Sequence, residues 1–305
     1  MLKSYDSLAE HVKARARKVR IAVAAAHDFH TLEGIAMAYV QGIAEPILIG
    51  DKYRIKSIIE NEELPLPTEG EERIKIIDVP DVKEAAAKAV SIVRKGQADI
   101  LMKGILPTAQ LMKEVVNKNT GIKGDSLLSH VGLFQIPAYH KLILLTDGGM
   151  LISPDAIEKR SLIENAVAVM ERMGCFMPKV AVLCATEDVN PKMQASIDAA
   201  MLKEWNEMGL LEDCIVEGPI SFDLMFDKNA AEIKGYESPV AGDADIWLMP
   251  DMTAGNLVAK SLMCAGGAMM AGIIVGASVP IVVVSRGATA AEKYYSLIFA
   301  AAVAG

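Results

Sequence analysis

Residues 281–292 indicate the fold class most directly, and they read Ile281-Val282-Val283-Val284-Ser285-Arg286-Gly287-Ala288-Thr289-Ala290-Ala291-Glu292. The four branched apolar residues are typical of a buried parallel strand, and the residues after them predict a turn into a helix. Such a strand places the hydroxyl of Ser285 and the guanidinium of Arg286 at its carboxyl end. The unpaired N–H groups and positive dipole end of the helix lie beside them. This arrangement favours an anion-binding site, and phosphate suits it best.

The same alternation of short aliphatic runs and longer amphipathic stretches continues along the whole chain. The expected strands are residues 19–25, 46–49, 74–78, 99–102, 142–146, 180–183, 215–217, 245–249, 272–275 and 281–284. The expected helices are residues 32–42, 52–61, 82–95, 109–116, 157–173, 191–208, 255–264 and 290–304. Repeated strand–helix units predict an α/β protein with mostly parallel, doubly wound sheets. Ligands of such sheets bind at the carboxyl ends of the strands.

Two polar breaks predict where the chain changes domain. The first is the segment 117–129 and the second is the turn at 276–280. We therefore expect a first α/β domain from residues 1–131 plus 277–305 and an inserted second α/β domain from residues 132–276, which suits a chain of 305 residues. Ser285 and Arg286 then face a cleft between the two domains. Helix starts are predicted at Ser153-Pro154-Asp155 and at Asp188-Val189-Asn190-Pro191.

The composition excludes several classes of function. Aromatic residues make up only 5% of the chain and the net charge is −8, which opposes binding of nucleic acid or of an anionic membrane surface. The four cysteines lack CxxC spacing, so neither a zinc site nor a disulfide framework is predicted. The N-terminus lacks the apolar core of a secretory signal, and residues 268–284 are interpreted as two buried strands around a turn. A soluble, cytoplasmic protein is expected.

Three residues near the C-terminus are the candidate catalytic groups. Arg286 offers two-point contacts to phosphate oxygens, and the alternative is an exposed arginine after an edge strand. Ser285 can donate to a developing oxyanion or simply end the strand. Thr289 and Glu292 match the T-x-x-E capping box, so Glu292 is either a helix cap or a general base near a bound anion.

Polar loops that follow other predicted strands supply the candidate binding residues. Each loop is a weak signal by itself, because Asp-Gly-Gly is also an ordinary turn, but together they line a cleft for a phosphate-bearing ligand. His27 and His30 could form a metal pair, although a solvated loop is the simpler interpretation. Motifs of P-loop NTPases, Rossmann dehydrogenases and serine hydrolases are missing. The candidate binding residues are Lys103, Gly104, Thr146, Asp147, Gly148, Gly255, Asn256 and Gly287.

Six ordered motifs resemble those of the phosphate acetyl/butyryltransferase family. They are ADILMKG (98–104), TDGGM (146–150), GPISFD (218–223), SPVAGDAD (238–245), PDMTAGN (250–256) and SRG (285–287). Within this family, EKYYSL (292–297) is most similar to the phosphate butyryltransferase, or branched-chain phosphotransacylase, branch. The resemblance covers nearly the whole chain.

The resemblance implies two α/β domains of the isocitrate/isopropylmalate-dehydrogenase-like type with an interdomain cleft, and a homodimer or higher homo-oligomer. The implied reaction is reversible: acyl-CoA and phosphate give acyl phosphate and CoA. CoA, acyl-CoA and phosphate are then substrates, with no permanently bound cofactor and no metal. By this resemblance Ser285 hydrogen-bonds the reacting carbonyl, Arg286 holds phosphate, and Glu292 stands where acetyltransferases have an aspartate base. The acetyl-preferring members' cysteine is replaced at Asp147-Gly148, which favours direct transfer in a ternary complex.

Three alternatives stay open. A phosphate acetyltransferase differs only in acyl preference. A metal-dependent, NAD-linked hydroxy-acid dehydrogenase of similar fold would need an aspartate cluster, for which Asp223, Asp227 and Asp251 are the candidates, the first two on one helix face. A non-catalytic CoA-sensing module would keep the phosphate-binding loops without needing Glu292.

Overall fold

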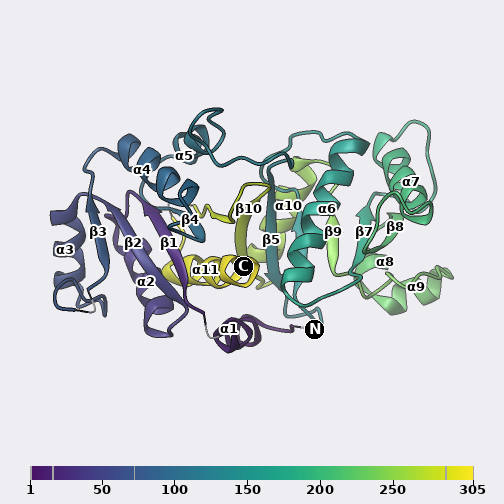
Figure 1. Ribbon diagram of the computed structural model, residues 1–305. Helices are drawn as coiled ribbons and strands as arrows, with labels where there is room; N and C mark the ends of the chain where they lie inside the picture. The colour runs from purple at the N-terminus through teal and green to yellow at the C-terminus, as the bar shows by residue number, and fades with distance from the viewer. Residues whose placement is uncertain (1, 16, 72, 286, 305) are drawn as a thin grey trace. The chain divides into compact units, whose positions relative to one another are not determined.

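The computed structural model describes residues 2–15, 17–71, 73–285 and 287–304. The chain forms two compact units, in each of which helices cover a mixed β-sheet (Figure 1). Unit 1 comprises Met1–Ser4 and Ser129–Met270, and unit 2 comprises Tyr5–Leu128 and Ala271–Gly305. The domains predicted from the sequence, 1–131 plus 277–305 and 132–276, have different boundaries from these units and stay a prediction.

Unit 2 is built from repeated strand–helix pairs. Its elements are α1 (Tyr5–Ala14), β1 (Val19–Ala24), α2 (Phe29–Val40), β2 (Ala44–Gly50), α3 (Lys52–Asn61), β3 (Lys75–Asp78), α4 (Val82–Arg94), β4 (Ile100–Lys103), α5 (Thr108–Val115), β11 (Ile281–Val282) and α11 (Ala290–Val303). The strand order is β3-β2-β1-β4-β11-β10, where β10 (Met269–Val275) enters from unit 1. β1, β2, β3, β4 and β11 run parallel, whereas β10 pairs antiparallel with β11.

Unit 1 follows the same plan with different connections. Its elements are β5 (Ser129–Gln135), β6 (Ile143–Thr146), α6 (Ala156–Arg172), β7 (Lys179–Leu183), α7 (Gln194–Glu207), β8 (Ile215–Ile220), α8 (Phe222–Phe226), α9 (Lys228–Lys234), β9 (Ile246–Leu248) and α10 (Met252–Cys264). The strand order is β5-β6-β9-β7-β8. β5 is antiparallel to β6, and the other pairs are parallel. The prediction of an α/β protein with mostly parallel strands is therefore confirmed.

Several predicted boundaries are wrong for identifiable reasons. β5 was not predicted, because Ser129, His130 and Gly132 break up the aliphatic run that marks the other strands. These residues belong to a strand that pairs with β6. The run 281–284 is a strand only at Ile281 and Val282, since β4 offers it two partner residues and β10 one.

Two helix starts also differ from the prediction. Asp155, and not Ser153, caps α6 and forms a capping box with Glu158. The helix α7 begins at Gln194, since Ser196 Oγ bonds the backbone of Asn190 and holds the preceding residues in a turn.

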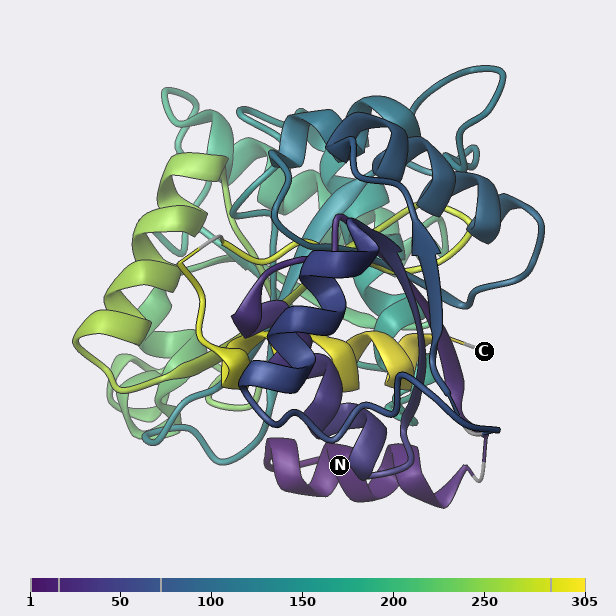
Figure 2. The same cartoon turned by 90° about the vertical axis from the view of Figure 1, so that its left-hand side faces the viewer.

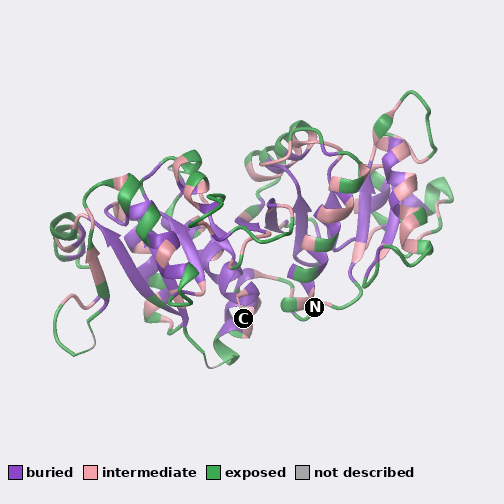
Figure 3. Cartoon of the chain, turned by 45° about the horizontal axis from the view of Figure 1, so that its top comes forward, coloured by how far each residue is buried: buried purple, intermediate pink, exposed green. Residues whose placement is uncertain are grey.

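The core of each unit lies between its sheet and its helices. Strand residues are largely buried, and the helices expose their outer faces (Figure 3). In unit 2 the helix α11 is buried along almost its whole length and lies against α2 (Figure 2). In unit 1 the large side chains of Phe134 and Trp247 occupy one cluster with Leu224 and Met225. None of the helices within the described residues is long and apolar enough to span a membrane.

Candidate active site

The loop after β6 in unit 1 is organised by the buried carboxylate of Asp147. One of its oxygens accepts hydrogen bonds from the backbone N–H groups of Gly149 (2.6 Å) and Met150 (2.8 Å). The other accepts the N–H of His130 at 3.0 Å, and Asp147 is only 2% exposed. Beside it, Thr146 Oγ1 donates to the carbonyl of His130 at 3.2 Å. Asp147 and Thr146 therefore join the ends of β5 and β6 and set the path of the loop.

The first turn of α10 packs directly on this loop. A Cβ at Gly148 would lie 3.2 Å from the carbonyl carbon of Gly255, and a Cβ at Gly255 would lie 2.8 Å from the carbonyl oxygen of Asp147. Asn256 Nδ2 also donates to the carbonyl of Gly148 at 3.4 Å. Asp251 caps the helix by accepting the N–H of Ala254 at 2.8 Å. The two glycines thus permit backbone contact between a strand-end loop and a helix N-terminus, which suits an anionic ligand.

His130 belongs to this cluster, although no partner is predicted for it from the sequence. Its ring lies against Gly149, where an added Cβ would lie 3.5 Å from Nδ1. The Nδ1 atom is buried and has no hydrogen-bond partner in the described part of the chain. Burial lowers the pKa of the imidazole, although the charge of Asp147 acts in the opposite direction. A neutral, partly exposed imidazole thus stands at the loop. The place of His130 in this cluster could have been predicted only from the pairing of β5 with β6, and β5 was not among the predicted strands.

In unit 2 the predicted residue Lys103 is the last residue of β4, and Gly104 follows it. Lys103 is buried, and its ammonium donates to the carbonyls of Gly104 (3.1 Å) and Leu106 (3.3 Å). A Cβ at Gly104 would lie only 2.2 Å from the carbonyl oxygen of Ala25, so glycine is required where this loop touches the loop after β1. The chain reverses its direction across the sheet between β1 and β4, and such switch points are the usual binding crevices of α/β sheets.

The C-terminal motif lies farther from its strand than predicted. β11 ends at Val282, so Ser285 is an exposed loop residue whose carbonyl accepts the N–H of Ala288 at 3.1 Å. Arg286 falls outside the described residues. Apart from its chain neighbours, no described residue has an atom within 4 Å of the position of a Cβ at Gly287. The placement of Ser285 directly at a strand end is therefore corrected, and the roles of all three residues stay predictions.

Glu292 forms the capping box that its spacing predicts. Its Oε2 accepts the backbone N–H of Thr289 at 2.7 Å and the hydroxyl of Thr289 at 3.0 Å. In return Thr289 Oγ1 accepts the N–H of Glu292 at 3.3 Å. The side chain is half-buried, so the carboxylate caps α11 while keeping contact with solvent. The second role, as a base, stays a prediction.

The neighbouring residue Lys293 is buried and anchors α11. Its ammonium lies 3.1 Å from Asp28 Oδ1 and 2.9 Å from Thr31 Oγ1. Asp28 is at the same time the N-cap of α2, accepting the N–H of Thr31 at 3.0 Å. The beginnings of α2 and α11 are thereby joined next to the candidate residue Glu292.

The aspartates of the dehydrogenase alternative are engaged locally and do not converge. The prediction that Asp223 and Asp227 share a helix face is wrong, since α8 ends at Phe226 and Asp227 caps α9. Hydrogen bonds from Ser221 and Lys234 lower the pKa of Asp223 to about 2. Among the described residues no group of three or more His, Cys, Asp or Glu side chains is arranged to hold a metal ion.

The chain was compared with known proteins. Its residues 72–301 match the family described as phosphate acetyl/butaryl transferase. The chain belongs to this family. It is 38% identical to the phosphate butyryltransferase of Clostridium acetobutylicum over 100% of this chain and 99% of the relative. It is also 39% identical to the phosphate acetyltransferase of Thermotoga maritima over 95% of this chain and 97% of the relative.

A solved structure supports the same assignment. The branched-chain phosphotransacylase from Enterococcus faecalis is 33% identical and superposes with a TM-score of 0.81, covering 93% of this chain and 99% of its own. The predicted family and acyltransferase class are thus confirmed. The matched span contains every predicted site residue, and the structure brings together Thr146, Asp147, Gly148, Gly255 and Asn256 in unit 1.

Proposed function

We propose that this acyltransferase moves a four- or five-carbon acyl group reversibly between CoA and inorganic phosphate. The observation that carries the proposal is the full-length similarity to a phosphate butyryltransferase, together with the likeness to a branched-chain phosphotransacylase. The similarity to a phosphate acetyltransferase, at 39% identity against 38%, makes acetyl transfer the second candidate.

The proposed chemistry is one direct displacement. A phosphate oxygen attacks the thioester carbonyl, the C–S bond breaks, and the proton of hydrogen phosphate ends on the CoA sulfur. Arg286 holds and orients phosphate, Ser285 donates to the developing oxyanion, and Glu292 carries the proton. Positioning both substrates together lowers the barrier by as much as roughly 7–11 kcal/mol in favourable cases.

The state of the cysteines favours this route over a covalent acyl-enzyme. Burial raises the pKa of Cys175 to about 11 and that of Cys214 to about 12, which suppresses the nucleophilic thiolate at neutral pH. Cys264 is the last residue of α10, nine residues from Gly255 and so about 13 Å along the helix. Cys184 Sγ contacts the sulfur of Met193 at 3.4 Å.

The test is release of free thiol from acetyl-, propionyl-, butyryl-, isobutyryl- and isovaleryl-CoA, with and without phosphate and with and without EDTA. We expect release that requires phosphate, survives chelation and is fastest with butyryl- or branched acyl-CoA. Fastest release from acetyl-CoA would assign the second candidate. Absence of phosphate-dependent release from every thioester would reject both and favour the CoA-sensing alternative.

A further inference from the structure

Unit 2 contains a basic pocket between α3 and β3, the outermost strand in its sheet order. The pocket has a volume of about 540 Å³. None of the predicted site residues that the structure describes lines it. Its wall includes the basic residues Lys52, Lys56, Arg73 and Lys75, together with Thr68, Gly70 and the acidic Glu69.

The spacing of the basic residues explains why they gather here. Lys52 and Lys56 are four residues apart on α3 and are therefore neighbours on one helix face, roughly 6 Å apart at Cβ. Arg73 and Lys75, the first residue of β3, are both exposed and flank the buried Ile74. Two pairs of cations thus come from two different elements to one pocket.

Most of this positive charge is not neutralised. Lys56 lies 3.5 Å from Glu69, but the Glu69 side chain is 85% exposed and this pair is weak. Lys52, Arg73 and Lys75 have no ion pair within the described part of the chain. Clustered like charges repel one another, and their presence in a chain of net charge −8 is unexpected. A bound polyanion relieves this repulsion.

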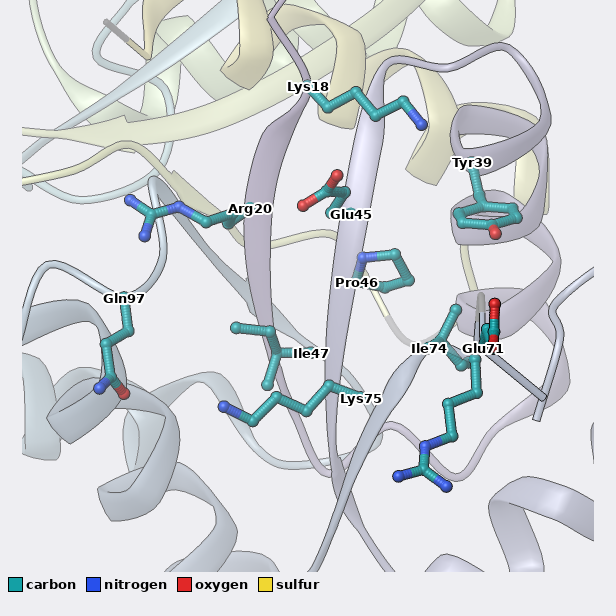
Figure 4. Close-up of a pocket in the computed structure, with 11 residues that line it drawn as sticks. Lys18, Arg20, Tyr39, Glu45, Pro46, Ile47, Glu71, Ile74, Lys75 and Gln97 are labelled. Atoms are coloured by element: carbon teal, nitrogen blue, oxygen red, sulfur yellow. The ribbon is translucent and has the colours of Figure 1, made fainter. Parts of the chain in front are cut away.

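A second pocket of about 560 Å³ adjoins the first and shares Arg73, Ile74 and Lys75 with it. Figure 4 shows Lys18, Arg20 and Glu45 near the beginnings of β1 and β2, with Lys75 on the next strand. Pro46, Ile47 and Ile74 give this pocket apolar surface, and Tyr39 and Gln97 lie on opposite sides of the strands. Arg20 is fixed by Asp99, with Nε–Oδ2 of 3.0 Å and Nη2–Oδ1 of 2.8 Å. The second pocket suits an aromatic or polar organic group.

We propose that unit 2 binds a nucleotide diphosphate group at these adjoining pockets, with the phosphates among Lys52, Lys56 and Arg73 and the attached organic group toward Tyr39. The site is separate from the candidate active site. The second-pocket residues Arg20, Glu45 and Lys75 lie near the amino ends of their strands, whereas Lys103 ends β4 at its carboxyl end. Lys52 follows the carboxyl end of β2, which is two strand spacings from β4. Three strand spacings, roughly 14 Å, separate β3 from β4. The proposal therefore goes beyond the proposed acyl transfer.

The experiment is calorimetric titration of the full chain with ADP, inorganic pyrophosphate and CoA. The pocket variant is Lys56→Gln/Arg73→Gln, and the matched control is Lys83→Gln/Lys88→Gln, which removes the same charge from exposed positions of α4. We expect ADP to bind the wild type and the control alike, and to bind the pocket variant at least about tenfold more weakly, because two charge-assisted contacts are lost.

The three ligands identify the source of the diphosphate. Weakened binding of both pyrophosphate and ADP in the pocket variant supports recognition of the diphosphate itself. Binding of CoA alone, with a raised KM for CoA in the pocket variant, would overturn the separate site and make the pocket part of the substrate site. The proposed diphosphate site would also be overturned if the pocket variant and the control bound ADP with equal affinity. Failure of the wild type to bind ADP would overturn it as well. Acyl transfer is assayed separately on the same proteins, so its failure leaves the binding result interpretable.

Discussion

Lys293 and Asp28 form an ion pair of 3.1 Å across 265 residues of sequence. The side chain of Lys293 is 6% exposed and that of Asp28 is 17% exposed. The second carboxylate oxygen of Asp28 is buried and has no hydrogen-bond partner among the described residues. Lys293 thus compensates most of the buried charge where α2 and α11 begin.

Replacing Lys293 by methionine should therefore destabilise the protein. The substitution leaves the carboxylate of Asp28 without its cation, and we expect the free energy of unfolding to fall by roughly 3 kcal/mol. The measurement is urea denaturation, with Lys83→Met as a control at an exposed position of α4. A loss no larger than that of the control would show that the pair contributes nothing.

Glu292 and Thr289 allow the cap and the base to be separated. Glu292→Gln retains an oxygen for the N–H of Thr289, so stability should change by less than about 0.5 kcal/mol, whereas kcat should fall by about 10²–10⁴ if the carboxylate carries the proton. Thr289→Ala removes a cap and should cost about 1 kcal/mol of stability with little effect on kcat. Unchanged turnover of Glu292→Gln would end the assignment of a base.

Gly255 should tolerate alanine poorly despite its place in a helix. Alanine favours a helix by about 1 kcal/mol over glycine, but the new Cβ would lie 2.8 Å from the carbonyl of Asp147 and 2.9 Å from Gly148 Cα. We expect a net loss of stability and displacement of the loop after β6. Gly287→Ala is the control, since no described atom apart from those of its chain neighbours lies within 4 Å of its Cβ position. Thermal unfolding compares the two, and a stabilised Gly255→Ala would contradict the packing described here.

Asp147→Asn tests whether this carboxylate organises the loop. The asparagine oxygen can still accept the N–H groups of Gly149 and Met150, but its NH₂ group would face the N–H of His130, two donors in contact. We expect a loss of about 1–3 kcal/mol in unfolding free energy. If Asp147 acted only on a ligand, stability would be unchanged and only KM would rise.

The pair of Asp99 and Arg20 predicts a pH dependence of stability. Hydrogen bonds from Arg20 hold the pKa of Asp99 below its ordinary value of 3.8. The stabilisation is therefore complete above the unfolded pKa of about 3.9 and is lost as the pH falls through the lower folded value. Since the Arg20 side chain is 39% exposed and screened, we expect Asp99→Asn to cost about 1 kcal/mol at pH 7.

The difference between Asp99→Asn and wild type should shrink below about pH 4. Asp125→Asn, at an exposed loop position, is the control for the change in net charge. A constant difference between pH 7 and pH 3 would argue against the ion pair as its source.

Local signals in the sequence predicted much of this molecule. The helix 52–61 and the capping box of Glu292 were visible because both depend on neighbouring residues. The backbone contact of Gly148 with Gly255 and the pair of Lys293 with Asp28 were not, since they depend on which distant strands and helices become neighbours. β5 was missed for the same reason, because its first residues become strand only through pairing with β6.

Unit 2 is interrupted in sequence by residues 129–270 of unit 1, and this has a practical consequence for protein engineering. Within unit 2, Lys123 bridges to Ala277, and Ser278 N–H donates to the carbonyl of Ile122 at 2.9 Å. The segments of unit 2 on either side of this interruption are thus already joined by backbone hydrogen bonds. From there, the remaining five residues of β10 down to Ala271 span about 17 Å. A flexible connector of about eight residues is therefore long enough to join Leu128 to Ala271 in place of residues 129–270.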